Sequence, residues 1–219
     1  MYKGYTLIKA KRKTIAIRIT KEGEVVVRCP MRMTKLQAEA FVQQHMDWIN
    51  KNLAEVCKRK NEKESFTAGD GSVVYYLGEE YVIRLSEKSD KVVLSGREII
   101  IPANAKDKKS ALLEFFRQQS KLILPQLVQK WSDVMSVTPR SVKITSAKTR
   151  WGSCSGKNGI CFSLRLICLP VEVIEYVVVH ELCHIKHHNH STAFYAMVES
   201  FLPDYKEKIK LMRTFKLQI

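Results

Sequence analysis

One short histidine-rich segment constrains the fold of this 219-residue chain more than any other feature. Five of the six histidines fall between residues 180 and 190, in the segment HELCHIKHHNH. On an α-helix, residues four apart are separated by about 40° around the axis and about 6 Å along it, so His180 and His184 could bind one metal ion together. On a β-strand they would lie about 13 Å apart. Shared metal binding therefore requires a helix at this position.

The residues directly before this segment favour a different structure. Val177 to Val179 are β-branched, and such a run is typical of a buried strand. A strand would leave the histidines unable to share an ion, so we interpret the run as part of a helix that is buried on most sides. We expect this helix to begin after Pro170 and to cover residues 171–188.

His180, Glu181 and His184 form the H-E-x-x-H pattern of zincins. In this pattern the glutamate lies near the metal without having to bind it. Its carboxylate can accept a proton from a water molecule activated by the ion and later return that proton to a leaving group. We therefore predict one Zn²⁺ per chain, with Glu181 as the catalytic general base.

A catalytic zinc site normally has three protein ligands, so a third ligand is needed. Three further histidines are available, and we rank His190 first, His187 second and His188 third. His190 would reach the ion if the helix ended near His188 and the chain turned back at Asn189, a residue type that tolerates the left-handed conformation of helix ends. On an unbroken helix, His187 and His188 would lie about a turn beyond His184.

The remaining pattern predicts an α+β fold, in which a β-rich N-terminal half precedes a zincin-like helical half with a small antiparallel sheet against the metal helix. We expect residues 1–105 to form a β-rich subdomain with one long helix and residues 106–219 to form the hydrolase subdomain, although the two could be one continuous domain. Residues 58–71 resemble a polar loop, and Pro125 should kink or divide its helix. The expected strands are 15–19, 25–28, 73–77, 81–85, 92–94, 98–101, 142–144 and 159–168, and the other expected helices are 34–58, about 107–131, 191–201 and 205–215.

Charge and cysteine content limit the partners and the location. The chain has 37 Lys and Arg residues against 22 Asp and Glu residues, a formal net charge of +15. This charge suits nucleic acid, nucleotides or acidic protein surfaces, or it keeps the protein in solution. No segment approaches the roughly 18 apolar residues of a membrane helix, so we expect a cytoplasmic protein without membrane contact. The six cysteines contain no C-x-x-C pair, so we expect reduced and mostly buried thiols.

A second motif, RWGSCS at residues 150–155, lies upstream of the histidines. Arg150 could steady an anion, and Ser153 could donate a hydrogen bond to a substrate. Trp151 could contact substrate too, but we favour a packing role for it under the metal helix, because large aromatic side chains are usually buried. Gly152 would allow close approach of two backbones. Cys154 is expected to be an inert thiol.

The two motifs together resemble the YgjP-like metal-dependent hydrolases, which are related to the SprT-like and WLM metallopeptidases. The resemblance rests on residues 150–155 and on the segment 176–194, which contains the H-E-x-x-H pattern. It implies that His180, His184 and His190 hold a zinc ion and that Glu181 is the general base. Metzincins share this ligand spacing, but their glycine position is occupied here by His187, which argues against a metzincin.

These observations support three hypotheses for the function. The leading one is a zinc metallopeptidase that cleaves peptides or proteins, with an extended substrate paired to an edge strand at residues 159–168. The second keeps the metal but assigns an anionic small molecule, a nucleoside triphosphate, as the substrate. The third is a nucleic-acid-associated zinc module that acts on bound proteins, with support from the charge alone. The sequence does not indicate an oligomeric state.

Overall fold

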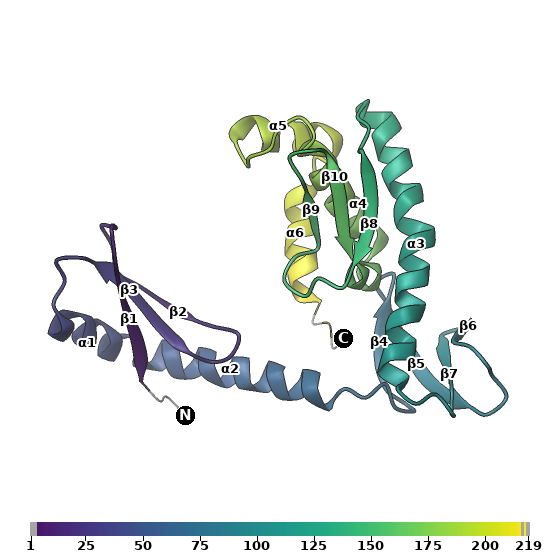
Figure 1. Cartoon of the computed structure of the whole chain (residues 1–219), viewed down its shortest axis with the longest axis horizontal. Coiled ribbons are helices and arrows are strands. Elements are labelled where there is room, and N and C mark those ends of the chain that lie inside the picture. Colours follow the sequence, from purple (N-terminus) through teal and green to yellow (C-terminus); the bar gives the residue numbers. More distant parts are fainter. Residues whose placement is uncertain (1–3, 216, 218–219) are drawn as a thin grey trace. The chain divides into compact units, whose positions relative to one another are not determined.

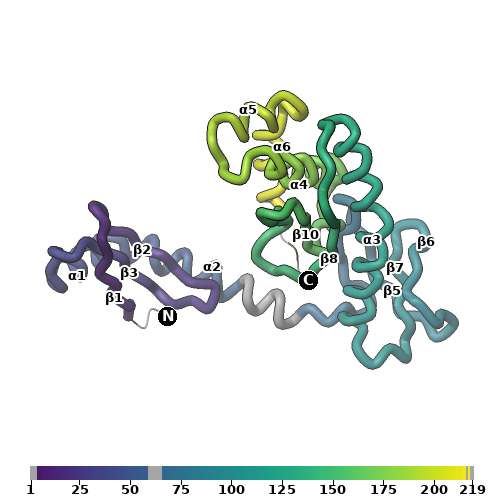
Figure 2. The backbone as a smooth tube through the Cα atoms, turned by 45° about the horizontal axis from the view of Figure 1, so that its top comes forward, coloured from purple at the N-terminus to yellow at the C-terminus, as the bar shows by residue number. Residues whose placement is uncertain are grey.

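The computed structural model describes residues 4–215 and 217, without the side chains of residues 59–65. The chain divides into two compact units, residues 1–65 and residues 66–219 (Figures 1 and 2). Both units mix helices and strands, so the predicted α+β class is confirmed. We expected a subdomain boundary between residues 105 and 106. These residues lie inside the second unit, between a strand and a helix that share one core.

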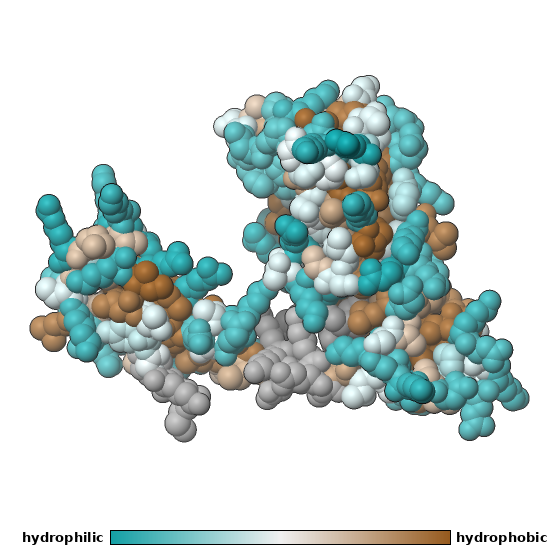
Figure 3. Space-filling view, in the orientation of Figure 1, coloured by the Kyte–Doolittle hydropathy of each residue, from teal (hydrophilic) through white to brown (hydrophobic). Residues whose placement is uncertain are grey.

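The N-terminal unit is a three-stranded sheet with two helices. The strands are β1 (Tyr5–Ala10), β2 (Ala16–Ile19) and β3 (Val25–Pro30), in the order β1-β3-β2. β2 and β3 form the predicted antiparallel hairpin, whereas β1, which we did not predict, pairs with β3 in parallel. The core contains buried residues from β3 and from both helices, namely Val25, Val27, Val42, Ile49 and Leu53. Figure 3 shows hydrophilic side chains projecting from the surface of this unit.

The helical part of this unit begins as predicted and then differs. Thr34 and Gln37 form a complete capping box at the start of α1 (Lys35–Gln44). The predicted single helix is interrupted at His45, whose Nδ1 donates to the carbonyl of Phe41 at 2.8 Å, and α2 (Met46–Ser65) follows. The expectation of a loop from residue 58 was therefore wrong up to residue 65. Lys, Arg and Glu are good helix formers, so a polar composition alone did not indicate a loop.

The second unit begins with a four-stranded sheet. Its strands are β4 (Val73–Tyr76), β5 (Glu79–Ser86), β6 (Val93–Ser95) and β7 (Glu98–Pro102), in the order β4-β5-β7-β6. Both predicted hairpins are present, and β5 pairs with β7 in parallel between them. The sheet shares a core with helix α3 (Lys108–Met135), where Ile83 and Ile99 pack with Leu112 and Phe116. This shared core is the reason that the sheet belongs to the second unit.

Helix α3 runs unbroken through Pro125, so the proline does not divide it. Asp107 caps its start by accepting a hydrogen bond from the backbone of Ser110, and Ser136 ends it in the left-handed conformation. A proline removes one backbone donor of a helix, and the loss is local. The helix of 28 residues stays continuous across the proline because one of its faces is buried along most of its length.

A small sheet follows, formed by β8 (Ser141–Thr145), β9 (Gly152–Cys154) and β10 (Gly159–Ser163) in the order β8-β10-β9. β10 is parallel to β8 and antiparallel to β9, so the sheet is mixed and not purely antiparallel as we expected. Because β10 is the central strand, it cannot be the substrate-binding edge strand. Residues 164–168, which we expected to continue the strand, form a short 3₁₀ helix. The side chain of Ser163 caps it by accepting a hydrogen bond from the backbone of Arg165. Leu166, Ile167 and Cys168 are buried in succession, which a strand with one exposed face would not allow.

Three helices complete the second unit, α4 (Val171–Cys183), α5 (Thr192–Phe201) and α6 (Tyr205–Thr214). Helix α4 lies at the centre, in contact with α3, α5, α6 and β9. Val177, Val178 and Val179 are all buried, which confirms a helix covered on most sides. It ends at Cys183, earlier than the predicted residue 188. No helix in the described part of the chain is long and apolar enough to span a membrane.

The turn between β4 and β5 holds the larger sheet against the start of α4. The backbone N–H of Leu77 donates to the carbonyl of Ile167 at 2.8 Å, and that of Gly78 donates to the carbonyl of Cys168 at 3.3 Å. Gly78 has a φ of +84°, and a Cβ atom there would lie 2.7 Å from the Cα of Pro170. Only glycine allows this contact, because any side chain would collide with the backbone.

We predict that Gly78→Ala destabilises the protein more than Gly96→Ala does. Gly96 also has a positive φ, of +55°, but a Cβ atom on it would meet nothing within 4 Å, so its substitution should cost only about 1 kcal/mol. Gly78→Ala adds the collision with Pro170 and should cost about 3 kcal/mol. Urea unfolding followed by tryptophan fluorescence measures both. Equal losses of unfolding free energy in the two variants would show that the close contact of Gly78 with Pro170 does not affect stability.

Candidate metal centre

The structure brings His180, His184 and His190 together. His180 lies in the last turn of α4, and His184 caps the end of that helix, with 5.0 Å between the two ring centroids. The Nε2 atom of His190 lies 3.1 Å from that of His180. One ligand atom from each of the three rings lies within 4.8 Å of the others. His187 and His188, the lower-ranked candidates, contribute no ring atom to this group.

The chain returns to the helix end through a turn stabilised by backbone groups. The N–H groups of Lys186 and His187 both donate to the carbonyl of Cys183, which closes the helix. Nδ1 of His184 then lies 2.9 Å from the carbonyl oxygen of His187. A carbonyl only accepts, so Nδ1 carries the proton and Nε2 of His184 keeps its lone pair for a metal ion. His187 therefore supports the site through its backbone, which sequence reasoning did not identify.

Aromatic side chains from two helices hold the three imidazoles in place. The ring of Phe194, which is fully buried, has centroid distances of 4.9, 4.5 and 4.9 Å to His180, His184 and His190. Ser191 caps the start of α5 by accepting a hydrogen bond from the backbone of Phe194. From α4, the hydroxyl of Tyr176 lies 3.4 Å from Nδ1 of His180. The rings are thus packed in position by residues that are not ligands.

Burial keeps the two helical histidines neutral. Desolvation, with smaller contributions from His184 and His190, lowers the pKa of His180 to about 4. Desolvation also lowers the pKa of His184. A neutral imidazole is the form that binds metal, so protons do not compete for His180 and His184 at neutral pH. Three imidazoles this close together are a donor set that fits a zinc ion.

Glu181 lies beside this group and is not one of its members. Only 5% of the residue is exposed, and its Oε2 atom has no hydrogen-bond partner among the described residues. Burial raises the pKa of Glu181 to about 7, and the positive charge of Arg150 acts in the opposite direction. A buried carboxyl with a free oxygen and a pKa near neutrality can both accept and donate a proton under physiological conditions.

Gly152 of β9 makes room for this carboxylate. A Cβ atom on Gly152 would lie 2.6 Å from Oε1 of Glu181 and 2.7 Å from its Cγ. The close approach expected at Gly152 is therefore present, and the group that approaches is the side chain of Glu181. A residue larger than glycine would displace the carboxylate.

The other residues of the 150–155 motif surround this contact. Trp151 is half-buried and packs against both apolar cores of the second unit, in agreement with a packing role. Arg150 is exposed and Ser153 is half-buried. Binding of substrate by Arg150, Trp151 and Ser153 stays a prediction. Cys154 lies near Glu181, and burial and that charge raise the pKa of its thiol, which favours the protonated form. Its expected inertness stays a prediction.

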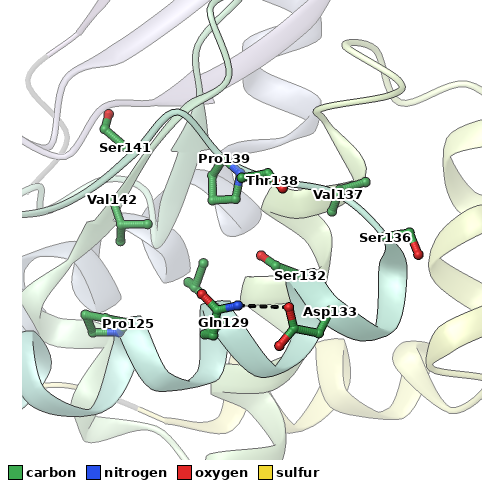
Figure 4. A pocket seen from close by; sticks show the side chains of 11 residues that line it. Pro125, Gln129, Ser132, Asp133, Ser136, Val137, Thr138, Pro139, Ser141 and Val142 are labelled. Atoms are coloured by element: carbon green, nitrogen blue, oxygen red, sulfur yellow. Dashed lines mark hydrogen bonds between the residues drawn. The ribbon is translucent and has the colours of Figure 1, made fainter.

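A separate cavity of about 480 Å³ lies between α3 and the segment that leads into β8 (Figure 4). None of the residues discussed for the metal centre lines it. Its walls come from Pro125, Val128, Gln129, Ser132, Asp133, Ser136, Val137, Thr138, Pro139, Ser141 and Val142. The candidate site is therefore the histidine cluster and not this cavity.

Comparison with known proteins agrees with the resemblance seen in the sequence. The model of the YgjP-like metallopeptidase domain matches residues 13–215. Comparison with curated proteins finds no match. Among solved structures, the crystal structure of the metallopeptidase zymogen of Pyrococcus abyssi abylysin is similar at 24% sequence identity and a TM-score of 0.40, over 43% of this chain and 97% of that chain. Because the family match includes the 150–155 motif and the whole histidine cluster, the chain belongs to the YgjP-like family of metallopeptidase domains.

Proposed function

We propose that this chain is a zinc-dependent peptidase. In this proposal His180, His184 and His190 hold one zinc ion, and Glu181 is the general base. The observation that carries it is the approach of three imidazole nitrogens to within 4.8 Å of one another, next to a buried carboxyl with a free oxygen. Membership of a metallopeptidase family supports peptides as the substrate class.

The protein groups around the site are suited to this reaction. A zinc ion held by the three histidines would supply Lewis acidity, which polarises the carbonyl of a peptide bond. Glu181 would accept the proton of the attacking water at Oε2 and return it to the amine that leaves. Its pKa of about 7 suits both steps, because a carboxyl that titrates near the working pH gives and takes a proton with similar ease.

The outer edge of β9 is the position that we propose for the substrate. The carbonyl of Trp151 accepts from Ser163, and the N–H of Ser155 donates to Gly159, so residues 151, 153 and 155 face β10. In an antiparallel pair the residues between them point their backbone groups away. The N–H and C=O groups of Gly152 and Cys154 therefore face outward beside Glu181. An extended peptide could add to this edge as a further strand.

A nucleoside triphosphate is the alternative substrate that one observation favours. Arg150 is exposed and close enough to Glu181 to lower its pKa, so it could bind a phosphate beside the site. A product survey by mass spectrometry distinguishes the two, with zinc-loaded protein incubated with unfolded protein and nucleoside triphosphates together. New peptide termini support the peptidase. Consumption of triphosphates without new termini would overturn it.

Two substitutions test the roles of ligand and base. We expect His184→Ala to lose zinc, measured by atomic spectroscopy, and turnover with it. Glu181→Gln should keep zinc and lose turnover by at least about 100-fold, because only the base is removed. His188→Ala is the matched control, since His188 is exposed and outside the ligand group, and it should keep both zinc and turnover. An active Glu181→Gln protein would exclude this mechanism.

The contact of Gly152 with Glu181 can be tested separately. Gly152→Ala should reduce turnover by about 100-fold while zinc content is unchanged, because the added methyl group displaces the carboxylate and leaves the histidines in place. Gly156→Ala serves as the control, because a side chain there meets nothing within 4 Å, and it should leave turnover essentially unchanged. Full activity in Gly152→Ala would mean that the position of Glu181 is not critical.

The raised pKa of Glu181 predicts a pH-dependent stability of the metal-free protein. Well below pH 4.5 the carboxyl is neutral in both states. Between about pH 4.5 and 7 it is mostly ionised in the unfolded chain and mostly neutral in the folded one, so rising pH increasingly favours the unfolded chain. The pKa of Glu181 is about 7 in the folded state and 4.5 in the unfolded state. The free energy of unfolding of Glu181→Gln should therefore exceed that of wild type by little at pH 4.5 and by about 3 kcal/mol above about pH 8.

Urea unfolding with a chelator present, repeated across this pH range, measures that gain. Glu87→Gln, which removes an exposed carboxyl, should show no comparable gain. A stability difference between Glu181→Gln and wild type that does not change with pH would contradict the raised pKa.

A further inference from the structure

The positive charge of the chain is concentrated in the N-terminal unit. Residues 1–65 contain 15 of the 37 Lys and Arg residues but only 7 of the 22 Asp and Glu residues. This unit therefore carries a net charge of +8, more than half of the total of +15, in less than a third of the chain. None of this charge is needed for the metal centre, all of whose residues lie in the second unit.

Two arginines stand on the open face of the three-stranded sheet. Val25, Val27 and Cys29 of β3 are buried toward the helices, so Val26 and Arg28 point to the opposite face. Arg18 of β2 pairs with Val26, which places it on the same face as Arg28 and diagonal to it. Both arginines are exposed. No element in the described part of this unit covers that face.

Further basic residues lie at one end of this sheet. β1 ends opposite Pro30 and β2 begins opposite Arg28, so the connection between them, residues 11–15, lies at the Pro30 end of β3. Lys11 and Lys13 in this connection are exposed, and so is Arg32, two residues beyond Pro30. We call Lys11, Lys13, Arg18, Arg28 and Arg32 the basic face.

Among the residues that the structure describes, the basic face has no acidic partner. None of its five residues forms an ion pair with any described residue, whereas Lys35 pairs with Glu39 on α1. Glu22 and Glu24 lie in or next to the β2–β3 turn, at the opposite end of the sheet. Exposed guanidinium groups without internal partners are free to bind an external anion, and they bind phosphate in a bidentate manner.

From this arrangement we propose that the basic face binds the sugar–phosphate backbone of duplex nucleic acid. Duplex is favoured over single strands because no described strand residue on the open face is aromatic, so an unpaired base would have nothing to stack on. Tyr5 of β1 pairs with Val25 and packs against the core on the other face. Contacts to phosphates alone are independent of base sequence and weaken steeply with salt. The proposal does not depend on the zinc-peptidase function, since the two sites share no residue.

The test uses the full-length protein and fluorescence anisotropy with a short labelled DNA duplex of mixed sequence. Arg18→Glu/Arg28→Glu should weaken binding by about tenfold or more and reduce the slope of log affinity against log salt by about 2. The matched control is Lys88→Glu/Lys91→Glu, which changes the net charge equally at exposed positions of the β5–β6 connection in the second unit. The control should retain most of the affinity.

Several outcomes would overturn the proposal. Equal losses in the two double variants would mean that overall charge, and not the basic face, determines binding. Absence of binding by the wild type at low salt, or tighter binding of an acidic polyglutamate peptide than of the duplex, would exclude nucleic acid as the partner. Arg18→Gln/Arg28→Gln, which is milder for folding, should give an intermediate loss. Unchanged circular dichroism and zinc content show that each variant is folded.

Discussion

The position of Glu181 depends on the contact of a buried carboxylate with a glycine, and much of the second unit is arranged around that contact. Helix α4 places Glu181 in a buried position, where ionisation of its carboxyl costs free energy. Strand β9 can lie this close to the helix only because Gly152 has no side chain. Helices α3, α5 and α6 cover the remaining sides of α4. The apolar core therefore keeps the pKa raised at Glu181, the residue proposed to transfer protons.

The sequence was most informative where structure depends on neighbours along the chain. The four-residue spacing of His180 and His184 determines their geometry on a helix, and the Thr34 capping box and the hairpin turns are equally local. Parallel pairings of β1 with β3 and of β8 with β10 join distant segments, so no local pattern predicted them. The end of α4 at Cys183 depends on backbone hydrogen bonds, which any residue type can form. We ranked His190 first because we expected the helix to end near His188 and the chain to turn back at Asn189. The helix ends earlier, at Cys183, and His190 still reaches the group.

The two units differ in what their surfaces and interiors provide. The second unit concentrates buried ionisable groups at one place, which is typical of a reaction centre. The N-terminal unit has a small core and an exposed, charged sheet, which is typical of a surface that contacts a partner. Each set of properties follows from its own residues, so each can be changed by substitution without altering the other.

The packing of Phe194 against three imidazoles has a consequence for how the proposed metal ion would be acquired. Because that ring and the turn at His187 already gather the ligands, the conformational entropy of ordering them is lost when the chain folds and not when the metal arrives. Zinc-finger peptides behave in the opposite way, since they fold only around their ion. By this argument the proposed centre is preorganised, so metal exchange and unfolding would be separate events, and a chelator would remove the ion from a chain that stays folded.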